Sequence, residues 1–274
     1  ALAARAAESP GSALRPPGWG PDVESWFSPH TLREIALLAD LIDGVKDEVR
    51  RRIFRVILSS NLIRLSKQAS DSITVVDRDW HPWRPRAAYR MFAERCHEVA
   101  LSFAQLGTDV RSRKVEWFEP ELILADARDP GHPKGIFGMG LASPPYPGTY
   151  DYAFHHFLRY PLFGETPAFV RRSEIGARRD FKAGGDAVER YVDDMTQCVK
   201  CALDALQPGA PLLMLIGDGR TRIQAVRSDL VLKEVAGRLA AVVEAGATQE
   251  RTEWSQGGGE QKKGEHFILI RRPR

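Results

Sequence analysis

The sequence has few cysteines, no long apolar run and almost no excess of charge of one sign. Three cysteines in 274 residues are too few for a fold held together by disulfides. No apolar run approaches the roughly 18 residues that a bilayer span needs, and the N-terminus lacks the pattern of a signal peptide. The formal net charge of +3 is too small to indicate a nucleic-acid partner unless the basic residues cluster. We therefore expect a cytoplasmic protein with free thiols.

The apolar pattern indicates an α/β fold, in a chain of ordinary globular composition with 43% hydrophobic and 27% charged residues. Helical spacing of apolar residues predicts helices over about 28–42, 45–68, 86–106, 186–206 and 228–244. Short apolar runs predict strands at 121–125, 136–142, 212–216 and 266–270. Because strands alternate with helices in the second half, the sheet is expected to be mostly parallel.

One segment, Leu141–Tyr152, has a composition that suits ligand binding. The predicted strand ends at Ala142, and Ser143-Pro144-Pro145-Tyr146 follows directly. The two prolines fix φ and have no N–H group, so the carbonyl groups beside them stay available as acceptors. Ligands of α/β sheets bind at the carboxyl ends of strands. The segment therefore predicts a site for a planar group with an exocyclic amine, such as a nucleobase; a proline-rich turn after a core strand is the alternative.

Ser143-Pro144-Pro145-Tyr146 resembles the (D/N/S)PPY motif of S-adenosylmethionine-dependent amino methyltransferases, which act on cytosine N4 or adenine N6 of DNA. The order of the later segments is also similar to that family, over roughly residues 121–271: Tyr150-Asp151-Tyr152, a helix leading to Leu206-Gln207-Pro208-Gly209, the strand at 212–216, Gly217-Asp218 and the closing strand. The resemblance implies a class I, Rossmann-like methyltransferase sheet lacking its first strands. It also implies a helical insertion over 28–115 and a catalytic core over 116–274, with 1–27 a loop and the remnant of a preceding helix.

The resemblance implies a chemistry for this motif. Ser143 and the Pro144 carbonyl would accept the hydrogens of the target amine and direct the nitrogen lone pair toward the sulfonium methyl group, and alignment of two reactants contributes strongly to rate. Tyr146 would stack through its ring, and not use its hydroxyl, on a base flipped out of the duplex. Serine at the first position favours cytosine N4 over adenine N6. Asp126 and Ala127 are the candidates for contact with the cofactor.

Cysteine chemistry and metal binding are disfavoured. Methylation at carbon 5 of cytosine needs a thiolate, usually in a Pro-Cys pair, and no cysteine here follows a proline. Cys198 and Cys201 form a CxxC pattern, but no second pair completes a zinc site. We expect both cysteines in the core and no metal.

The family's glycine-rich cofactor loop is not found in its usual place after a first strand. Gly217-Asp218-Gly219 follows a strand and is the alternative cofactor loop. Its position after the motif's helix favours the fifth strand of the sheet instead. We expect that the glycine loop and the acidic residue for the cofactor ribose lie N-terminal of Ala1.

Four basic clusters are candidates for phosphate contact, although each could equally be a solvated face. They comprise Arg50, Arg51 and Arg55; Arg111–Lys114; Arg171 and Arg172; Arg178 and Arg179. Residues 153–186 are the candidate target-recognition insert, and the resemblance allows a partner restriction endonuclease. Two other functions stay open: methylation of guanine N2 in transfer RNA, and nucleic-acid binding without activity.

Overall fold

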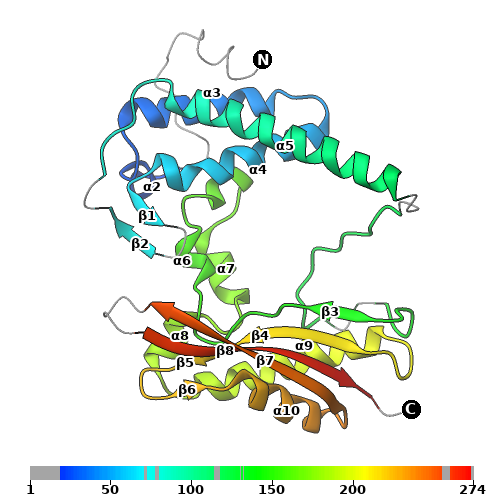
Figure 1. Ribbon diagram of the computed structural model, residues 1–274. Helices are drawn as coiled ribbons and strands as arrows, with labels where there is room; N and C mark the ends of the chain where they lie inside the picture. The colour runs from blue at the N-terminus through cyan, green and yellow to red at the C-terminus, as the bar shows by residue number, and fades with distance from the viewer. Residues whose placement is uncertain are drawn as a thin grey trace. The chain divides into compact units, whose positions relative to one another are not determined.

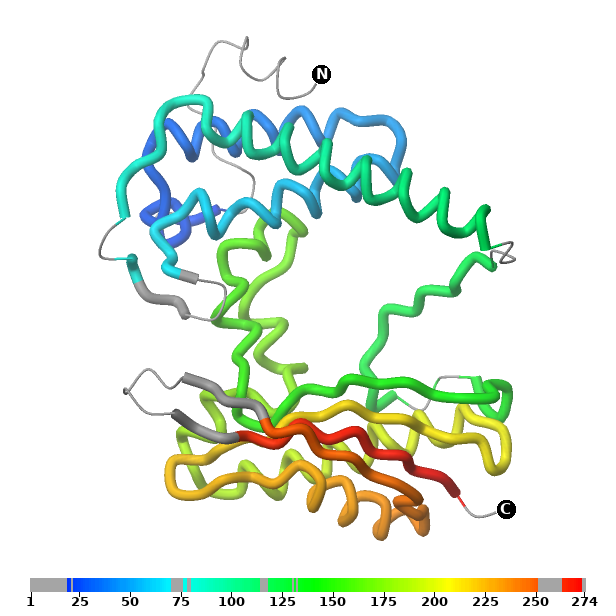
Figure 2. The backbone as a smooth tube through the Cα atoms, viewed as in Figure 1, coloured from blue at the N-terminus to red at the C-terminus, as the bar shows by residue number. Residues whose placement is uncertain are grey.

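The computed structural model describes residues 19–70, 73–77, 80–113, 118–129, 131, 133–254 and 260–272. The chain forms two compact units, and each is described here by itself (Figures 1 and 2). The helical unit comprises Ala1–Glu121 with Ala153–Arg172, and the sheet unit comprises Leu122–Tyr152 with Ser173–Arg274. Residues 1–18, which include the expected helix remnant, lie outside the described residues. Within the described ranges, no helix has the length and apolarity needed to cross a membrane.

The helical unit is built on three long helices that the apolar spacing predicts. Asp47 begins the second of them by accepting a hydrogen bond of 3.0 Å from the Arg50 N–H, an ordinary N-cap. Leu62 and Phe92 are buried between the helices. The elements are α2 (Pro21–Glu24), α3 (Pro29–Asp43), α4 (Glu48–Leu65), the antiparallel strands β1 (Gln68–Ser70) and β2 (Ile73–Val76), α5 (Ala87–Ser112), α6 (Tyr152–His155), the short 3-10 helix η1 (Tyr160–Phe163) and α7 (Pro167–Ser173).

The candidate insert 153–186 divides between the two units. Leu158 is fully buried in the core of the helical unit, with Phe157 and Leu162 packed beside it. Ile175 and Phe181 are instead buried in the core of the sheet unit. Packing of apolar side chains therefore assigns the first part of the insert to one unit and the last part to the other.

The sheet unit contains a four-stranded sheet in the order β3-β4-β8-β7 (Figure 1). Its elements are β3 (Gly140–Ala142), α8 (Arg178–Ala183), α9 (Ala187–Ala205), β4 (Leu212–Gly217), the two-residue strands β5 (Gly219–Arg220) and β6 (Ala225–Val226), α10 (Ser228–Arg238), β7 (Val242–Trp254) and β8 (Glu260–Arg271). β3 and β4 are parallel, and β8 pairs antiparallel with both β4 and β7. Three strands therefore run in one direction and β8 runs against them, which confirms the α/β class with a mixed sheet.

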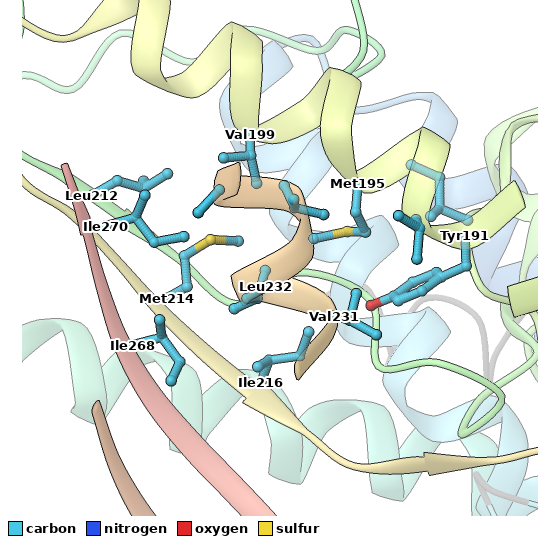
Figure 3. Close-up of a cluster of buried hydrophobic side chains, with 14 of the residues drawn as sticks. Tyr191, Met195, Val199, Leu212, Met214, Ile216, Val231, Leu232, Ile268 and Ile270 are labelled. Carbon is cyan, nitrogen blue, oxygen red and sulfur yellow. The ribbon is translucent and has the colours of Figure 1, made fainter. Parts of the chain in front are cut away.

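The core of the sheet unit lies between the sheet and the helices α9 and α10 (Figure 3). Leu212, Met214 and Ile216 alternate along β4 and are all buried, as expected for one face of a strand. Met195 of α9 and Leu232 of α10 are fully buried against them. Burial of side chains of this size contributes roughly 1.5–3 kcal/mol each, and so fixes the sheet that positions the site.

Several sequence predictions about this unit differ from the structure, among them the strand predicted over 136–142, which is limited to Gly140–Ala142. The segment 121–125 is not a strand: it has no regular structure, and Leu122 and Leu124 are 89% and 104% exposed. A strand needs a partner for its backbone groups, and no strand among the described residues pairs with this segment. The sequence of β7, VVEAGATQERTEW, has little apolar alternation and does not indicate a strand. The helix predicted over 228–244 ends at Arg238, and Ala240 then takes a positive φ of 50°.

Candidate functional site

The Ser143–Tyr146 corner lies at the carboxyl edge of the sheet, as the sequence predicts. Ala142 is the last residue of β3 and pairs in parallel register with Met214 of β4. Because the two strands are parallel, the end of β4 at Gly217 lies at the same edge as the corner. The corner and the loop after β4 therefore form one surface of the sheet unit.

The corner is fixed at Pro145 and open at the two residues before it. The Tyr191 hydroxyl donates a hydrogen bond of 2.7 Å to the Pro145 carbonyl. Burial raises the pKa of Tyr191 strongly, so its hydroxyl stays protonated and remains a donor. Within the described part of the chain, no hydrogen bond occupies the Ser143 hydroxyl or the Pro144 carbonyl, and Ser143 is exposed. Two acceptors are thus held by a rigid backbone and stay available to a ligand.

Tyr146 is positioned through both its ring and its hydroxyl. The hydroxyl donates a hydrogen bond of 3.0 Å to Glu265 Oε1 on β8. A Cβ atom at Gly217 would lie 2.7 Å from Cδ2 and Cε2 of the ring, so only glycine leaves room for this tyrosine. The hydroxyl thus has a structural role that the sequence does not reveal, because it ties the corner to β8. That the ring alone acts on the base stays a prediction.

Gly217-Asp218-Gly219 supports the corner. A Cβ atom at Gly219 would lie 1.7 Å from the Pro147 carbonyl oxygen. The Asp218 carboxylate accepts hydrogen bonds from the N–H groups of Ser228 (2.8 Å) and Gly264 (3.1 Å), and it pairs with His266 Nε2 at 2.8 Å. Neighbouring residues fill the space beside Gly217 and Gly219, and the Asp218 carboxylate already has three partners. Both facts disfavour the alternative interpretation of this segment as a cofactor loop.

The buried His266 completes this support. Its Nδ1 atom lies 2.9 Å from Thr248 Oγ1, and its Nε2 atom contacts Asp218. Asp218, Asp229 and His266 are close enough together to be considered as metal ligands. Asp229 is paired with Arg227 at 2.9 Å, so internal partners account for each member of the group. We assign it a structural role.

Asp126 and Ala127 lie in an exposed segment without helix or strand. The Arg128 side chain donates to the Asp126 carboxylate through Nε at 2.9 Å and Nη2 at 2.7 Å, and these hydrogen bonds lower the pKa of Asp126 to about 2. Arg128 also pairs with Asp194 at 2.8 Å. The carboxylate that the sequence assigns to the cofactor is therefore engaged by a neighbouring arginine.

Arg178 and Arg179 have partners inside the sheet unit. Arg178 Nε donates to the Thr149 carbonyl at 2.9 Å. Arg179 pairs with Asp151 at 2.6 Å and with Glu174 at 2.7 Å. These contacts hold the backbone after the corner, a role that the sequence clusters alone do not reveal.

The other predicted basic residues belong to the helical unit. Arg55 pairs with Asp43 at 2.7 Å, and Arg51 donates to the Val45 carbonyl at 3.1 Å. Arg50 lies 3.4 Å from Asp47, and Arg171 and Arg172 are exposed on α7. Arg111 is exposed near the end of α5, and Lys114 lies outside the described residues.

The cysteines lie where the sequence predicts them. Cys201 is buried on α9, and Cys198 packs against the same core. Burial raises the pKa of Cys198 to about 11, so the thiol is protonated at neutral pH. Neither thiol is suited to act as a nucleophile.

Comparisons with known proteins give a small set of similar solved structures. No protein-family model matches the chain, and no curated protein matches it. One similar structure is that of TTHA0409, "Putative DNA Modification Methylase", from Thermus thermophilus, with 15% identity and a TM-score of 0.35, covering 55% of this chain and 53% of that one. The same protein complexed with S-adenosyl-L-methionine has 16% identity and a TM-score of 0.34, covering 55% and 52%. The chain thus matches about half the length of these structures.

Proposed function

We propose that this chain provides the target-binding corner of an S-adenosylmethionine-dependent DNA amino methyltransferase. The observation that carries the proposal is that the Ser143–Tyr146 corner presents two available hydrogen-bond acceptors at the carboxyl edge of the sheet. The Ser143 hydroxyl and the Pro144 carbonyl are available as acceptors in the described structure, while Tyr191 fixes the Pro145 carbonyl. The backbone of the corner is thus held in place while these two acceptors have no protein partner among the described residues.

The arrangement suits the exocyclic amine of a nucleobase. This amine is a poor nucleophile because its lone pair is delocalised into the ring. Ser143 and the Pro144 carbonyl would each accept one amine hydrogen, which turns the lone pair out of the plane of the base. Tyr146 would stack on the base once it has left the duplex, which offsets part of the cost of unstacking. The corner needs no thiolate and no metal for this task.

The choice of base follows from the first residue of the corner. Serine in place of an acid or amide favours cytosine N4 over adenine N6. Guanine N2 of RNA is the competing target, since it too is an exocyclic amine, and binding without activity is the non-enzymatic alternative. A partner endonuclease and a restriction-modification role stay predictions of the family resemblance.

S-adenosylmethionine supplies the methyl group in this family, and the described residues do not form a complete site for it. Tyr146 and Pro147 fill the space at Gly217 and Gly219, so neither glycine lets a ligand approach the backbone. Arg128 engages the Asp126 carboxylate, so contact of Asp126 and Ala127 with the cofactor stays a prediction of the family resemblance. The cofactor is therefore proposed from the chemistry of the corner, and we assign it no binding residues here.

Nucleoside mass spectrometry tests the proposal without knowledge of the recognition sequence. The natural gene product is expressed in a host whose DNA contains no amino-methylated bases, and the DNA and RNA are digested and analysed. N4-methylcytosine or N6-methyladenine in DNA that disappears with Ser143→Ala supports the proposal and identifies the base. N2-methylguanine in RNA alone would support the RNA alternative, and DNA binding with no methylated base would support the non-enzymatic one. Lys134→Ala is the matched control, because Lys134 is exposed before β3, at the opposite edge of the sheet.

A further inference from the structure

The β5–β6 hairpin, residues 219–226, packs directly against the backbone that follows the Ser143–Tyr146 corner. Its first residue, Gly219, lies against the Pro147 carbonyl. A Cβ atom at Gly148 would lie 2.7 Å from the Arg220 carbonyl oxygen, so the two backbones touch here as well. The buried Val226 holds the returning strand in the core. The base of the hairpin therefore lies beside the backbone that follows the corner.

The tip of the hairpin is a short ordered turn. The Thr221 N–H donates to the Gln224 carbonyl at 2.9 Å. Thr221 Oγ1 accepts a hydrogen bond of 3.1 Å from the Gln224 N–H. Because the turn is already ordered, its backbone needs little further ordering when the hairpin binds a partner.

The side chains on the hairpin are basic with an apolar residue at the tip. Arg220 and Arg222 are exposed, and in the described part of the chain no ion pair engages either one. Arg222 and Ile223 line a hollow with the acidic residues Asp186, Glu189 and Glu234. Asp186 is paired with Arg190, and Glu234 is paired with Arg238 at 2.7 Å. Ile223, next to Arg222, is 89% exposed. Arg220 and Arg222 differ in this respect from Arg178 and Arg179, which bind the Thr149 carbonyl and the Asp151 carboxylate.

We propose that the β5–β6 hairpin is the element that holds duplex DNA at the corner, with Arg220 and Arg222 on backbone phosphates and Ile223 inserted between bases. The proposal rests on the proposed function and extends it, because it names residues that contact the duplex around the flipped base. Unpaired arginines bind phosphates and release counterions. Isoleucine is among the apolar side chains that proteins insert between base steps. A base that leaves the stack leaves a gap in the duplex, and Ile223 is the exposed apolar side chain of the hairpin that can fill it.

Salt-dependent binding of this chain to a fluorescein-labelled duplex of mixed sequence tests the phosphate contacts. Anisotropy titrations give the affinity at several salt concentrations between about 50 and 200 mM, the range over which phosphate contacts change affinity strongly. For Arg220→Ala and Arg222→Ala, the slope of log affinity against log salt should become shallower by about 1 each. Lys134→Ala removes the same charge at the other edge of the sheet and should leave the slope unchanged. Parent slopes in both arginine variants, or an equal change in Lys134→Ala, would overturn the phosphate contacts.

A second comparison tests Ile223. The intact duplex is compared with one that carries an abasic site, where a gap already exists. Ile223→Ala should weaken binding to the intact duplex several-fold more than binding to the abasic duplex. The Ile223 side chain is needed only where stacked bases must be separated. Leu230→Ala, an exposed leucine on α10, is the apolar control and should change neither affinity. Equal weakening of both duplexes by Ile223→Ala, or tighter binding of the parent chain to an RNA hairpin than to the duplex, would overturn the assignment.

These outcomes can be separated from a failure of the proposed function. If the hairpin variants bind DNA like the parent while Ser143→Ala abolishes base methylation, the hairpin proposal fails and the amine corner stands. If the hairpin variants lose salt-dependent binding but no methylated base is ever formed, the hairpin is a DNA-binding element and the methyltransferase proposal fails.

Discussion

The hydroxyl of Tyr191 on α9 lies 2.7 Å from the carbonyl oxygen of Pro145. Pro145 follows Pro144, and neither proline has an N–H group. Because Pro145 lies outside the strands, no strand among the described residues donates a hydrogen bond to its carbonyl. A fully buried side chain from a helix that begins 42 residues after the proline supplies the donor instead. The corner that we assign to amine binding is in this way fixed by the core of the sheet unit.

Tyr191→Phe should therefore weaken both stability and function. The change leaves the packing intact and removes one hydrogen bond, which contributes about 0.5–1.5 kcal/mol. We expect a loss of that size in urea unfolding, together with a reduced rate of methyl transfer. Tyr89→Phe, in the helical unit, is the control and should leave the rate unchanged. A Tyr191→Phe protein that loses stability at parent activity would show that the bond serves folding alone.

Substitutions of Tyr146 separate the ring from the hydroxyl. Tyr146→Ala removes base stacking, worth on the order of 1–3 kcal/mol, so single-turnover methylation of duplex DNA should fall by about ten- to a hundredfold or more. Tyr146→Phe keeps the ring and loses the hydrogen bond to Glu265, so its melting temperature should fall slightly while its activity stays near that of the parent. If Tyr146→Phe is as inactive as Tyr146→Ala, the ring is not the functional part of this residue.

The chain of 274 residues should bind S-adenosylmethionine weakly or not at all. The glycines that could approach a cofactor are filled by Tyr146 and Pro147, and Asp218 is engaged by three neighbours. Calorimetric titration of the chain alone measures this affinity. Micromolar binding would contradict the prediction and would restore Gly217-Asp218-Gly219 as the cofactor loop.

The Asp126–Arg128 pair should make a contribution to stability that is lost in acid. Arg128 lowers the pKa of Asp126 from 3.8 to about 2, so the folded protein prefers the ionised carboxylate. The contribution is complete above the unfolded pKa and disappears as the pH falls through the folded value. Asp126→Asn should therefore lower the melting temperature at neutral pH and make little difference near pH 2, at the folded pKa. The effect should be small because the side chain is 42% exposed. An equal difference at both pH values would show that the pair does not act through its charge.

The sequence predicts the corner well because local chemistry decides it. Two consecutive prolines after an apolar strand leave few possible conformations, and the helical spacing of Tyr191 and Met195 identifies the face of α9 that is buried. The segment 121–125 has an equally apolar composition, but a strand forms only with a partner, and composition does not show whether a partner exists. The support of Tyr146 by Gly217 and Glu265 joins residues 71 and 119 positions apart, a contact that no local pattern can reveal.

The roles of the arginines were the least predictable from sequence. Arg178 and Arg179 form as clear a cluster as any in the chain, yet both are used to hold the backbone after the corner. Arg220 and Arg222 alternate with other residues and form no run, and their exposure becomes visible only in the structure of the hairpin. A cluster of arginines shows only that they are neighbours in the sequence. Contact with phosphates depends instead on which arginines have no carboxylate partner in the folded protein.

The central claim is that the Ser143 hydroxyl accepts a hydrogen from the target amine, and single-turnover methyl transfer by Ser143→Ala in the natural gene product tests it most directly. Loss of one well-placed polar group from a preorganised site reduces the rate by roughly 100-fold or more. We predict a loss of that size with saturating S-adenosylmethionine, at unchanged DNA affinity and unchanged melting temperature, because Ser143 is exposed and has no partner among the described residues. A folded Ser143→Ala protein that methylates DNA at the parent rate would contradict the claim.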